Sequence, residues 1–204
     1  LPVDALVFSE KAKYIYIGRD GRDVVWSLYN HHLNANAAWY DALNNTQGRV
    51  GPAIEPPCSL ISQYFDGWLN QDGFPFWSLW DNARTWWAIR NLPNVHMVHF
   101  ANLKSDLPGE FRRIAKFIGT PIDESKWHEI LNHCSFEYMK ANAKKTVPLG
   151  GAFWDGGAET FIHKGTNGRW RDVLSAEQIM NYEQRAELEI GSEGAHWFAT
   201  GELR

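Results

Sequence analysis

The sequence predicts a layered α/β fold with a mainly parallel sheet. Two short apolar runs, residues 14–17 and 95–100, have the aromatic and β-branched composition of buried strands. Between and after these runs, apolar residues recur at helical spacing. Strands that alternate with helices favour a parallel sheet, because parallel strands need a long crossover connection that a helix usually supplies.

The first expected strand passes directly into a helix. Residues 14–17 have apolar neighbours on both sides, which predicts a strand covered on both faces. Asp20 is placed to cap the helix that follows, and Gly21 eases the turn into it. The polar stretch at 34–57 contains several prolines and glycines, which predicts a long loop. Loops of this length inside a compact domain are usually functional or disordered.

Helical patterns continue through the rest of the chain. Residues 106–118 place apolar side chains on one face and end at Gly119, a typical C-cap glycine. The stretch 146–167 is rich in glycine and has no sustained periodicity, which predicts a mobile loop. Ser175 begins a final helix, with Gln178 in its first turn. The other expected helices span residues 59–70, 77–90, 123–132 and 135–143.

Composition limits the class of protein. With 204 residues, 44% of them hydrophobic and 22% charged, the chain can bury one sizeable core, so we expect residues 1–204 to form a single domain. The net charge of −4 argues against a protein that coats nucleic acid or an anionic membrane. No apolar run approaches the ~18 residues of a membrane span, and no signal peptide is visible. Cys58 and Cys134 have no metal-ligand spacing, which indicates reduced thiols in a cytoplasmic protein, and the histidines form no metal pattern.

A candidate anion site lies where the first strand meets the first helix. Arg19 stands at the end of the strand, and Ser27 lies eight residues later in the helix. A phosphate monoester is a dianion, and a guanidinium at a strand end together with a helix N-terminus supplies fixed donors for it. The alternative is that Arg19 only pairs with Asp20 or Asp23 on the surface.

The segment 14–27 resembles the 3'-phosphate-binding motif of the PAPS-dependent, cytosolic-type sulfotransferases, where PAPS is 3'-phosphoadenosine 5'-phosphosulfate. A second segment, 161–171, resembles the R-K-G-x-x-G-D-W-K block of the same family. The resemblance implies a three-layer α/β fold of the P-loop nucleotide-hydrolase type. It also implies that the 3'-phosphate is held by residues of both segments, namely Arg19, Ser27, Lys164 and Gly165. The alternative for the second segment is a basic surface loop.

Two positions of the second segment depart from the family block. His163 stands where the family has Arg, and a histidine with an unperturbed pKa of ~6.5 is mostly neutral at pH 7 and lacks the planar guanidinium fork. We therefore expect nucleotide binding that is weaker or depends on pH. Arg169 stands where the family pattern has Asp.

Two further segments resemble the family's adenine-binding region. Residues 135–140 resemble S-F-x-x-M-K, which makes Phe136 the candidate for stacking on the adenine and Met139 its neighbour. Residues 98–104 resemble a strand ending in Y-E-D-L-K, with Phe100 in place of the Tyr. Stacking of a base on an aromatic side chain is worth ~1–3 kcal/mol. For both phenylalanines, packing in the core is the alternative.

The sequence is rich in tryptophan where the family builds its acceptor pocket. An aromatic-lined pocket suits a small apolar or aromatic molecule with a hydroxyl group as the acceptor. Core packing is the favoured alternative, because part of the set recurs at helical spacing. The tryptophans concerned are Trp68, Trp77, Trp80, Trp86 and Trp87.

The family's P-K-x-G-x-T-W loop, which supplies a lysine to the 5'-phosphosulfate, has no counterpart in this sequence. The family's general base is a histidine just before a Leu-Pro pair, and this chain begins with Leu1-Pro2. We therefore expect the catalytic His and Lys upstream of Leu1. The resemblance implies metal-free, in-line transfer of the sulfuryl group from PAPS to a hydroxyl, with PAP (3'-phosphoadenosine 5'-phosphate) as product. Because general-base assistance is typically worth about 10²- to 10⁴-fold, residues 1–204 alone are not expected to catalyse at an ordinary rate.

Two other functions are alternatives. One is a non-catalytic domain that binds a 3'-phosphoadenosine nucleotide or a partner and derives from this family. The other is a relative of the P-loop kinases, but the sequence contains no Gly-x-x-x-x-Gly-Lys-Ser/Thr motif. Assembly into a homodimer stays open.

Overall fold

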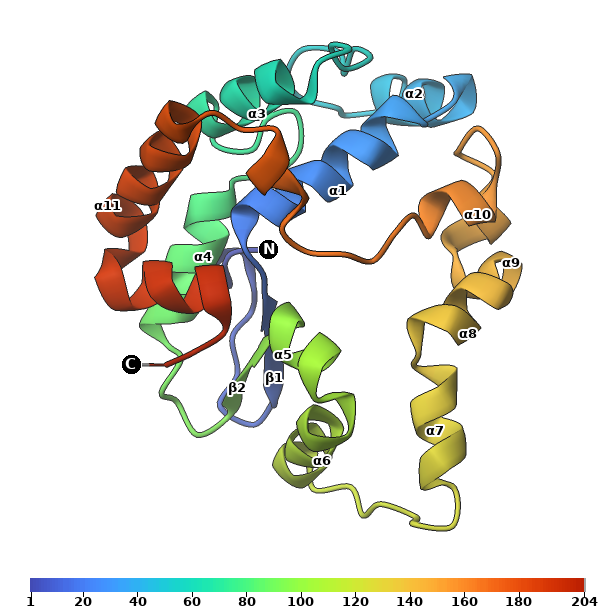
Figure 1. The fold of residues 1–204 in the computed structure, drawn as a ribbon, viewed down its shortest axis with the longest axis vertical. Coiled ribbons are helices and arrows are strands. Elements are labelled where there is room, and N and C mark those ends of the chain that lie inside the picture. Colours follow the sequence, from blue (N-terminus) through green and yellow to red (C-terminus); the bar gives the residue numbers. More distant parts are fainter. Residues whose placement is uncertain (204) are drawn as a thin grey trace.

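The computed structural model describes residues 1–203 and has an α/β architecture (Figure 1). Strands β1 (Tyr14–Gly18) and β2 (Val95–His99) pair in parallel, with Tyr14 beside Val95 and Gly18 beside His99. The α/β class and the parallel pairing are therefore confirmed. Within residues 1–203 the sheet contains these two strands.

Helices make up most of the remaining structure. The α-helices are α1 (Gly21–Leu33), α2 (Ala37–Asn44), α3 (Ile61–Asn70), α4 (Leu79–Ala88), α5 (Phe100–Ser105), α6 (Leu107–Ile118), α7 (Trp127–His133), α8 (Phe136–Ala141), α9 (Ala143–Thr146), α10 (Ala158–Phe161) and α11 (Ala176–Thr200). Short 3₁₀ turns are η1 (Val3–Ala5), η2 (Pro148–Gly151) and η3 (Arg169–Asp172). In Figure 1, α4 and α11 lie on one side of the strands and α5 and α6 on the other, while the segment from α7 to α10 runs back toward α1.

Helices pack on one face of β1 much more closely than on the other. Tyr16 stacks on Trp86 of α4 with ring centroids 5.4 Å apart. Gly18 packs so closely on α11 that a Cβ atom would lie 2.4 Å from the Trp197 ring. On the opposite face, Ile15 is 39% exposed and Ile17 is 58% exposed. The expectation of a strand covered on both faces is therefore wrong for β1 in the described chain. Alternate side chains point to opposite faces, and α4 and α11 cover one face of β1, whereas α5 and α6 contact mainly β2.

The main core confirms the packing role of most of the tryptophans. Apolar side chains of α1, α3, α4, α11 and the η3 region form one buried cluster that includes Trp68, Trp80 and Trp87. Trp86 is also buried. Trp77 is 63% exposed and precedes α4, which begins two residues later than the sequence predicts because the Ser78 side chain caps it by accepting the Asp81 N–H.

Two stretches expected to be loops contain helices. Within 34–57, α2 forms because Asn36 caps a stretch that contains three alanines and a leucine, accepting the Trp39 N–H at 3.2 Å. Within 146–167, α10 and η2 pack against α9 around a small buried cluster of Ala143, Val147 and Ala158. Both stretches lack a long periodic pattern, because each helix is shorter than nine residues.

Other helix ends follow local capping chemistry. Gly119 ends α6 with φ 81°, and Ser175 with Gln178 forms a capping box at the start of α11, as the sequence predicts. The expected helix at 123–132 begins only at Trp127, because the Asp123 carboxylate accepts the Ser125 N–H and O–H in a preceding turn.

A buried ion pair fixes the corner between β1 and α1. The Asp20 side chain caps α1 and pairs with Arg22 at 2.9 Å. The Arg22 guanidinium lies 3.8 Å from the Trp170 ring and 4.9 Å from the Tyr182 ring. The Tyr182 hydroxyl oxygen also accepts the Gly21 N–H at 3.0 Å. The corner thus holds η3 and α11 onto the start of α1.

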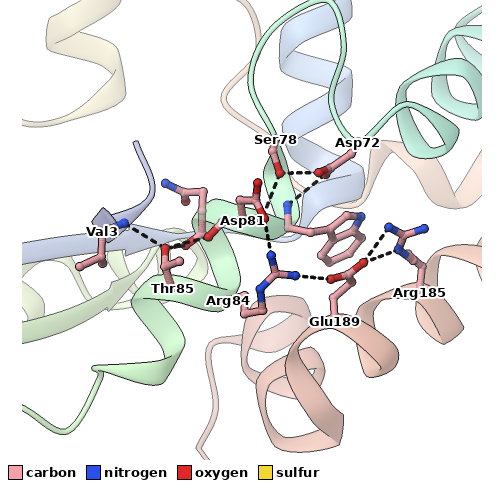
Figure 2. Close-up of polar contacts among 10 residues, drawn as sticks. Val3, Asp72, Ser78, Asp81, Arg84, Thr85, Arg185 and Glu189 are labelled. Carbon is pink, nitrogen blue, oxygen red and sulfur yellow. Dashed lines mark hydrogen bonds and ion pairs between the residues drawn. The ribbon is translucent and has the colours of Figure 1, made fainter. Parts of the chain in front are cut away.

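Polar contacts join α4 to α11 on the outer side of the core (Figure 2). Glu189 of α11 accepts hydrogen bonds from Arg84 of α4 at 2.7 Å and from Arg185 at 2.8 Å. On the other side of α4, Thr85 accepts the Val3 N–H at 3.0 Å, which holds the first residues against the helix. These contacts orient the two helices that cover β1.

Within residues 1–203, no helix is both long enough and apolar enough to cross a bilayer.

The free energy of unfolding should fall as the solution is acidified from neutral pH. Burial lowers the pKa of five histidines: His31, His32, His96, His99 and His163. Below ~6.5, the unfolded pKa, the unfolded chain takes up protons that the folded chain resists, so protons favour unfolding. We expect the urea midpoint to be lower at about pH 5.5 than at about pH 7.5, and to change little above pH 7.5. An equal or higher midpoint at the acidic pH would contradict this account.

Candidate functional site

The two motif segments meet around one cavity of about 220 Å³. Its walls come from the β1–α1 corner, α1, the start of α5, α8 and the loop that follows α10. Every residue that the sequence predicts for the site lines this cavity: Arg19, Ser27, Phe100, Phe136, Met139, His163, Lys164 and Gly165. Residues separated by up to 146 positions along the chain are thus brought together.

Arg19 follows β1 and points across the cavity mouth. Its Nη2 donates to the Asn167 side chain at 2.9 Å and to the Thr166 carbonyl at 3.4 Å. Its guanidinium lies 4.3 Å from the Phe100 ring, and its Nε is buried without a hydrogen-bond partner in the described chain. Burial lowers the pKa of Arg19, against the attraction of Asp23 and Asp20. The guanidinium keeps its charge, so it is a partly desolvated cation with unused donor capacity.

The surface ion pairs considered for Arg19 do not form. Asp20 pairs with Arg22, and Asp23 accepts the Gly168 N–H at 2.7 Å. Asp23, Ser27 and His31 follow one another at intervals of four along α1, and all three line the cavity. One face of α1 therefore carries an acid, a hydroxyl and an imidazole toward the same space.

The loop at 164–168 depends on glycine at its closest approach to α8. Gly165 has φ +60°, and a Cβ there would lie 2.7 Å from the Phe136 ring. Lys104 of α5 donates to the Gly165 carbonyl. The loop is therefore held against α5 and α8, with Lys164 facing the cavity.

Two histidines face the cavity in a neutral state at pH 7. Burial lowers the pKa of His163, and the nearby cations Arg169, Lys164 and Lys140 lower it further. Burial and then His163 lower the pKa of His31. The His163 Nε2 has no hydrogen-bond partner in the described chain.

An apolar cavity of about 420 Å³ adjoins the first. The two cavities share Phe100, Phe136, Met139 and Gly165. The second is otherwise lined mainly by residues of α5 and α6 and the start of α8, including Leu103, Leu107, Phe111 and Cys134. The combined space has a cationic half and an apolar half, which suits a ligand with a phosphate-like group joined to a flat ring.

Some residues that line or support the site were not predicted. Lys104 lies in the segment that resembles Y-E-D-L-K, so its place in that block is a usable signal. His31 carries only the weaker signal of lying four residues after Ser27 on a helix. Asn167 has no signal in the sequence, because its contact with Arg19 depends on how the loop folds.

A larger hollow of about 830 Å³ lies between α3 and α11. It is lined mostly by polar residues and contains none of the motif residues. In residues 1–203, no group of three or more His, Cys, Asp or Glu side chains is arranged to hold a metal ion.

The comparisons with known proteins identify the family. Residues 1–192 match the family model for the sulfotransferase domain, so the chain belongs to the sulfotransferase domain family. It is 28% identical over 182 residues to Sulfotransferase 2B1 of Mus musculus, covering 87% of this chain and 48% of that protein. It is 23% identical over 205 residues to the Glycolipid sulfotransferase Rv1373 of Mycobacterium tuberculosis (strain ATCC 25618 / H37Rv), covering 90% of this chain and 63% of that protein. The chain thus spans about half to two thirds of the length of these curated relatives.

Solved structures share the fold. Mouse sulfotransferase SULT7A1 complexed with PAP matches with a TM-score of 0.69 at 20% identity, over 92% of this chain and 61% of that one. Retinol dehydratase in complex with androsterone and inactive cofactor PAP matches with a TM-score of 0.59 at 24% identity, over 84% of this chain and 45% of that one. The α/β fold expected from the resemblance is therefore that of the family.

Replacing Gly165 by Ala should displace the loop from α8. The left-handed backbone costs a side chain ~1–2 kcal/mol, and the contact with Phe136 adds to that cost. Gly48→Ala is the matched control, because Gly48 has φ +80° but nothing within 4 Å of the added Cβ. We expect Gly165→Ala to lose more unfolding free energy than the control and to shift the Phe136 ring signals in NMR spectra. Equal losses with unchanged ring signals would show that the close packing does not exist.

Proposed function

We propose that this protein is a sulfotransferase that moves the sulfuryl group from PAPS to the hydroxyl group of a small-molecule acceptor. The observation that carries this proposal is the joined pair of cavities, one cationic and one apolar, with four residues shared between them. PAPS and PAP combine a phosphate monoester with an adenine ring, which matches this pairing. Membership of the sulfotransferase domain family supports the same reaction.

The 3'-phosphate is assigned to the cationic cavity. Arg19 offers the buried Nε that lacks a partner, and Lys164 supplies a second cation from the opposite wall. Ser27 adds a hydroxyl from α1, and Gly165 lets the backbone approach closely. Charge-assisted hydrogen bonds from such donors are about twice as strong as neutral ones. The protein carries a net charge of −4, so this binding depends on the local cations.

The adenine is assigned to the apolar cavity. Phe136 lies between the two cavities and offers a ring face for stacking, with Met139 beside it. Phe100 lies under Arg19 and also lines both cavities. A ring in this position would anchor the nucleotide while the 3'-phosphate fixes its direction.

In the reaction, the sulfur–oxygen bond to the 5'-phosphate of PAPS breaks and a sulfur–oxygen bond to the acceptor forms. The acceptor hydroxyl gives up its proton to a base, and PAP leaves. The cavity residues of this chain bind and orient the nucleotide, and holding the donor in a fixed position lowers the entropic part of the barrier. No residue in this chain is assigned as the base.

The tryptophans give less support to an apolar acceptor than the sequence predicts. Four of the five tryptophans singled out by the sequence are core residues, and Trp77 is exposed. The proposed acceptor is therefore a small molecule with a hydroxyl group, and acceptor screening measures which polarity it prefers.

The proposal also includes a cytoplasmic protein in which residues 1–204 form one domain. The two free cysteines, both exposed, support a reducing compartment. A homodimer stays a prediction.

Calorimetric titration tests the nucleotide assignment. We expect PAP to bind selectively over 5'-AMP, because only PAP carries the 3'-phosphate. Arg19→Ala should weaken PAP binding by about tenfold or more, since a hydrogen bond to a charged group is worth ~1.5–3 kcal/mol. Lys116→Ala, an exposed cation on α6 that lines neither cavity, should leave the affinity unchanged. Equal binding of PAP and 5'-AMP, or an unaffected Arg19 variant, would reject the assignment.

His163 should make PAP binding depend on pH. Its lowered pKa leaves it neutral in the empty site, and a bound phosphate would favour its protonated form. His163→Arg carries a permanent charge, so it should tighten binding more at about pH 8 than at about pH 6. The second ionisation of phosphate, with a pKa of ~6, affects both proteins equally and cancels in the affinity ratio. A ratio that does not change with pH would show that His163 does not face the phosphate.

A further inference from the structure

A carboxylate lies inside the cationic cavity. Asp23 is 4% exposed and lines the same space as Arg19 and Lys164. Burial raises the pKa of Asp23, against the hydrogen bond from Gly168 and the attraction of Arg19 and Arg22. A carboxylate in this position repels a phosphate, so its presence in an anion site requires a compensating role.

The contact that Asp23 makes is to the loop rather than to a cation. Its Oδ1 accepts the Gly168 N–H at 2.7 Å, which joins α1 to a residue 145 positions later. Gly168 has φ +78° and immediately precedes η3, whose Trp170 stacks on Arg22. The hydrogen bond therefore fixes the end of the 164–168 loop to α1.

Among the described residues, the other two side chains that hydrogen-bond to this loop are cations. Arg19 donates to the Thr166 carbonyl and the Asn167 side chain, and Lys104 donates to the Gly165 carbonyl. An entering phosphate competes for Arg19, which lines the cationic cavity, because a charged acceptor binds a guanidinium more strongly than a neutral carbonyl or amide does. Gly168 does not line this cavity, and its N–H already donates to a charged acceptor. A phosphate in the cavity therefore leaves the contact between Asp23 and Gly168 in place.

We propose that Asp23 is a positioning residue of the nucleotide site, which holds the 164–168 loop on α1 through the Gly168 amide while the anion draws Arg19 away from the loop. The identity of the anion as the 3'-phosphate of PAP rests on the proposed function. The role of Asp23 in holding the loop does not.

Two substitutions separate the acceptor role of Asp23 from its charge. Asp23→Asn keeps an oxygen that can accept the Gly168 N–H but removes the charge. Asp23→Ala removes both. We expect Asp23→Ala to weaken PAP binding by about tenfold or more, the order of one hydrogen bond to a charged group. Asp23→Asn should bind PAP as tightly as the unchanged protein or more tightly, because the repulsion of the phosphate is removed.

Hydrogen exchange of the Gly168 amide in the ligand-free protein supplies a readout independent of the nucleotide. The exchange should be faster in Asp23→Ala and close to that of the unchanged protein in Asp23→Asn. The inference is overturned if the Asp23→Asn variant loses as much PAP affinity as the Asp23→Ala variant. It is also overturned if the Gly168 amide exchanges at the same rate in both variants and in the unchanged protein. If the unchanged protein does not bind PAP, the proposed function fails, and the exchange measurement still accepts or rejects the role of Asp23. Urea unfolding of each variant checks that the change is local.

Discussion

The ion pair between Asp20 and Arg22 is buried where β1 passes into α1, and three other parts of the structure are built on it. The rings of Trp170 and Tyr182 both pack against the Arg22 guanidinium, and the Tyr182 oxygen accepts the Gly21 N–H. The start of α1 is thereby fixed to η3 and α11 at the same point. Replacing Arg22 would leave the Asp20 carboxylate buried without its ion-pair partner, a change that typically costs ~3–5 kcal/mol.

The site follows from that corner in two steps. The stack of Trp170 on Arg22 brings the end of the 164–168 loop to α1, and the loop then closes one side of the cationic cavity. Lys104 and Phe136 hold the other side of the loop. Position 165 needs a glycine, because a side chain there would collide with the Phe136 ring. In this way a protein with a net negative charge can gather cationic side chains in one cavity. The local arrangement matters more for anion binding than the net charge does.

The predicted site residues come together in space, whereas parts of the fold do not follow from sequence patterns. All eight line one cavity, because the four segments that resemble family blocks specify which parts of the chain must meet. The parallel strands and the caps at Gly119 and Ser175 also follow from short-range chemistry. The exposure of Ile15 and Ile17 could not be predicted, since a strand's composition does not say which face its neighbours cover. The helices within 34–57 and 146–167 are too short to produce a periodic signal, and the contact of Asn167 with Arg19 depends on the folded loop alone.

In the proposed nucleotide site, one ligand contacts both the β1–α1 corner and the 164–168 loop, and a crystal structure of the chain with bound PAP would show whether it does. We expect the 3'-phosphate within hydrogen-bond distance of Arg19 and Ser27, at about 2.7–3.0 Å, and the adenine against the Phe136 ring. A PAP molecule bound elsewhere, for example in the polar hollow between α3 and α11, or an adenine turned away from Phe136, would contradict it.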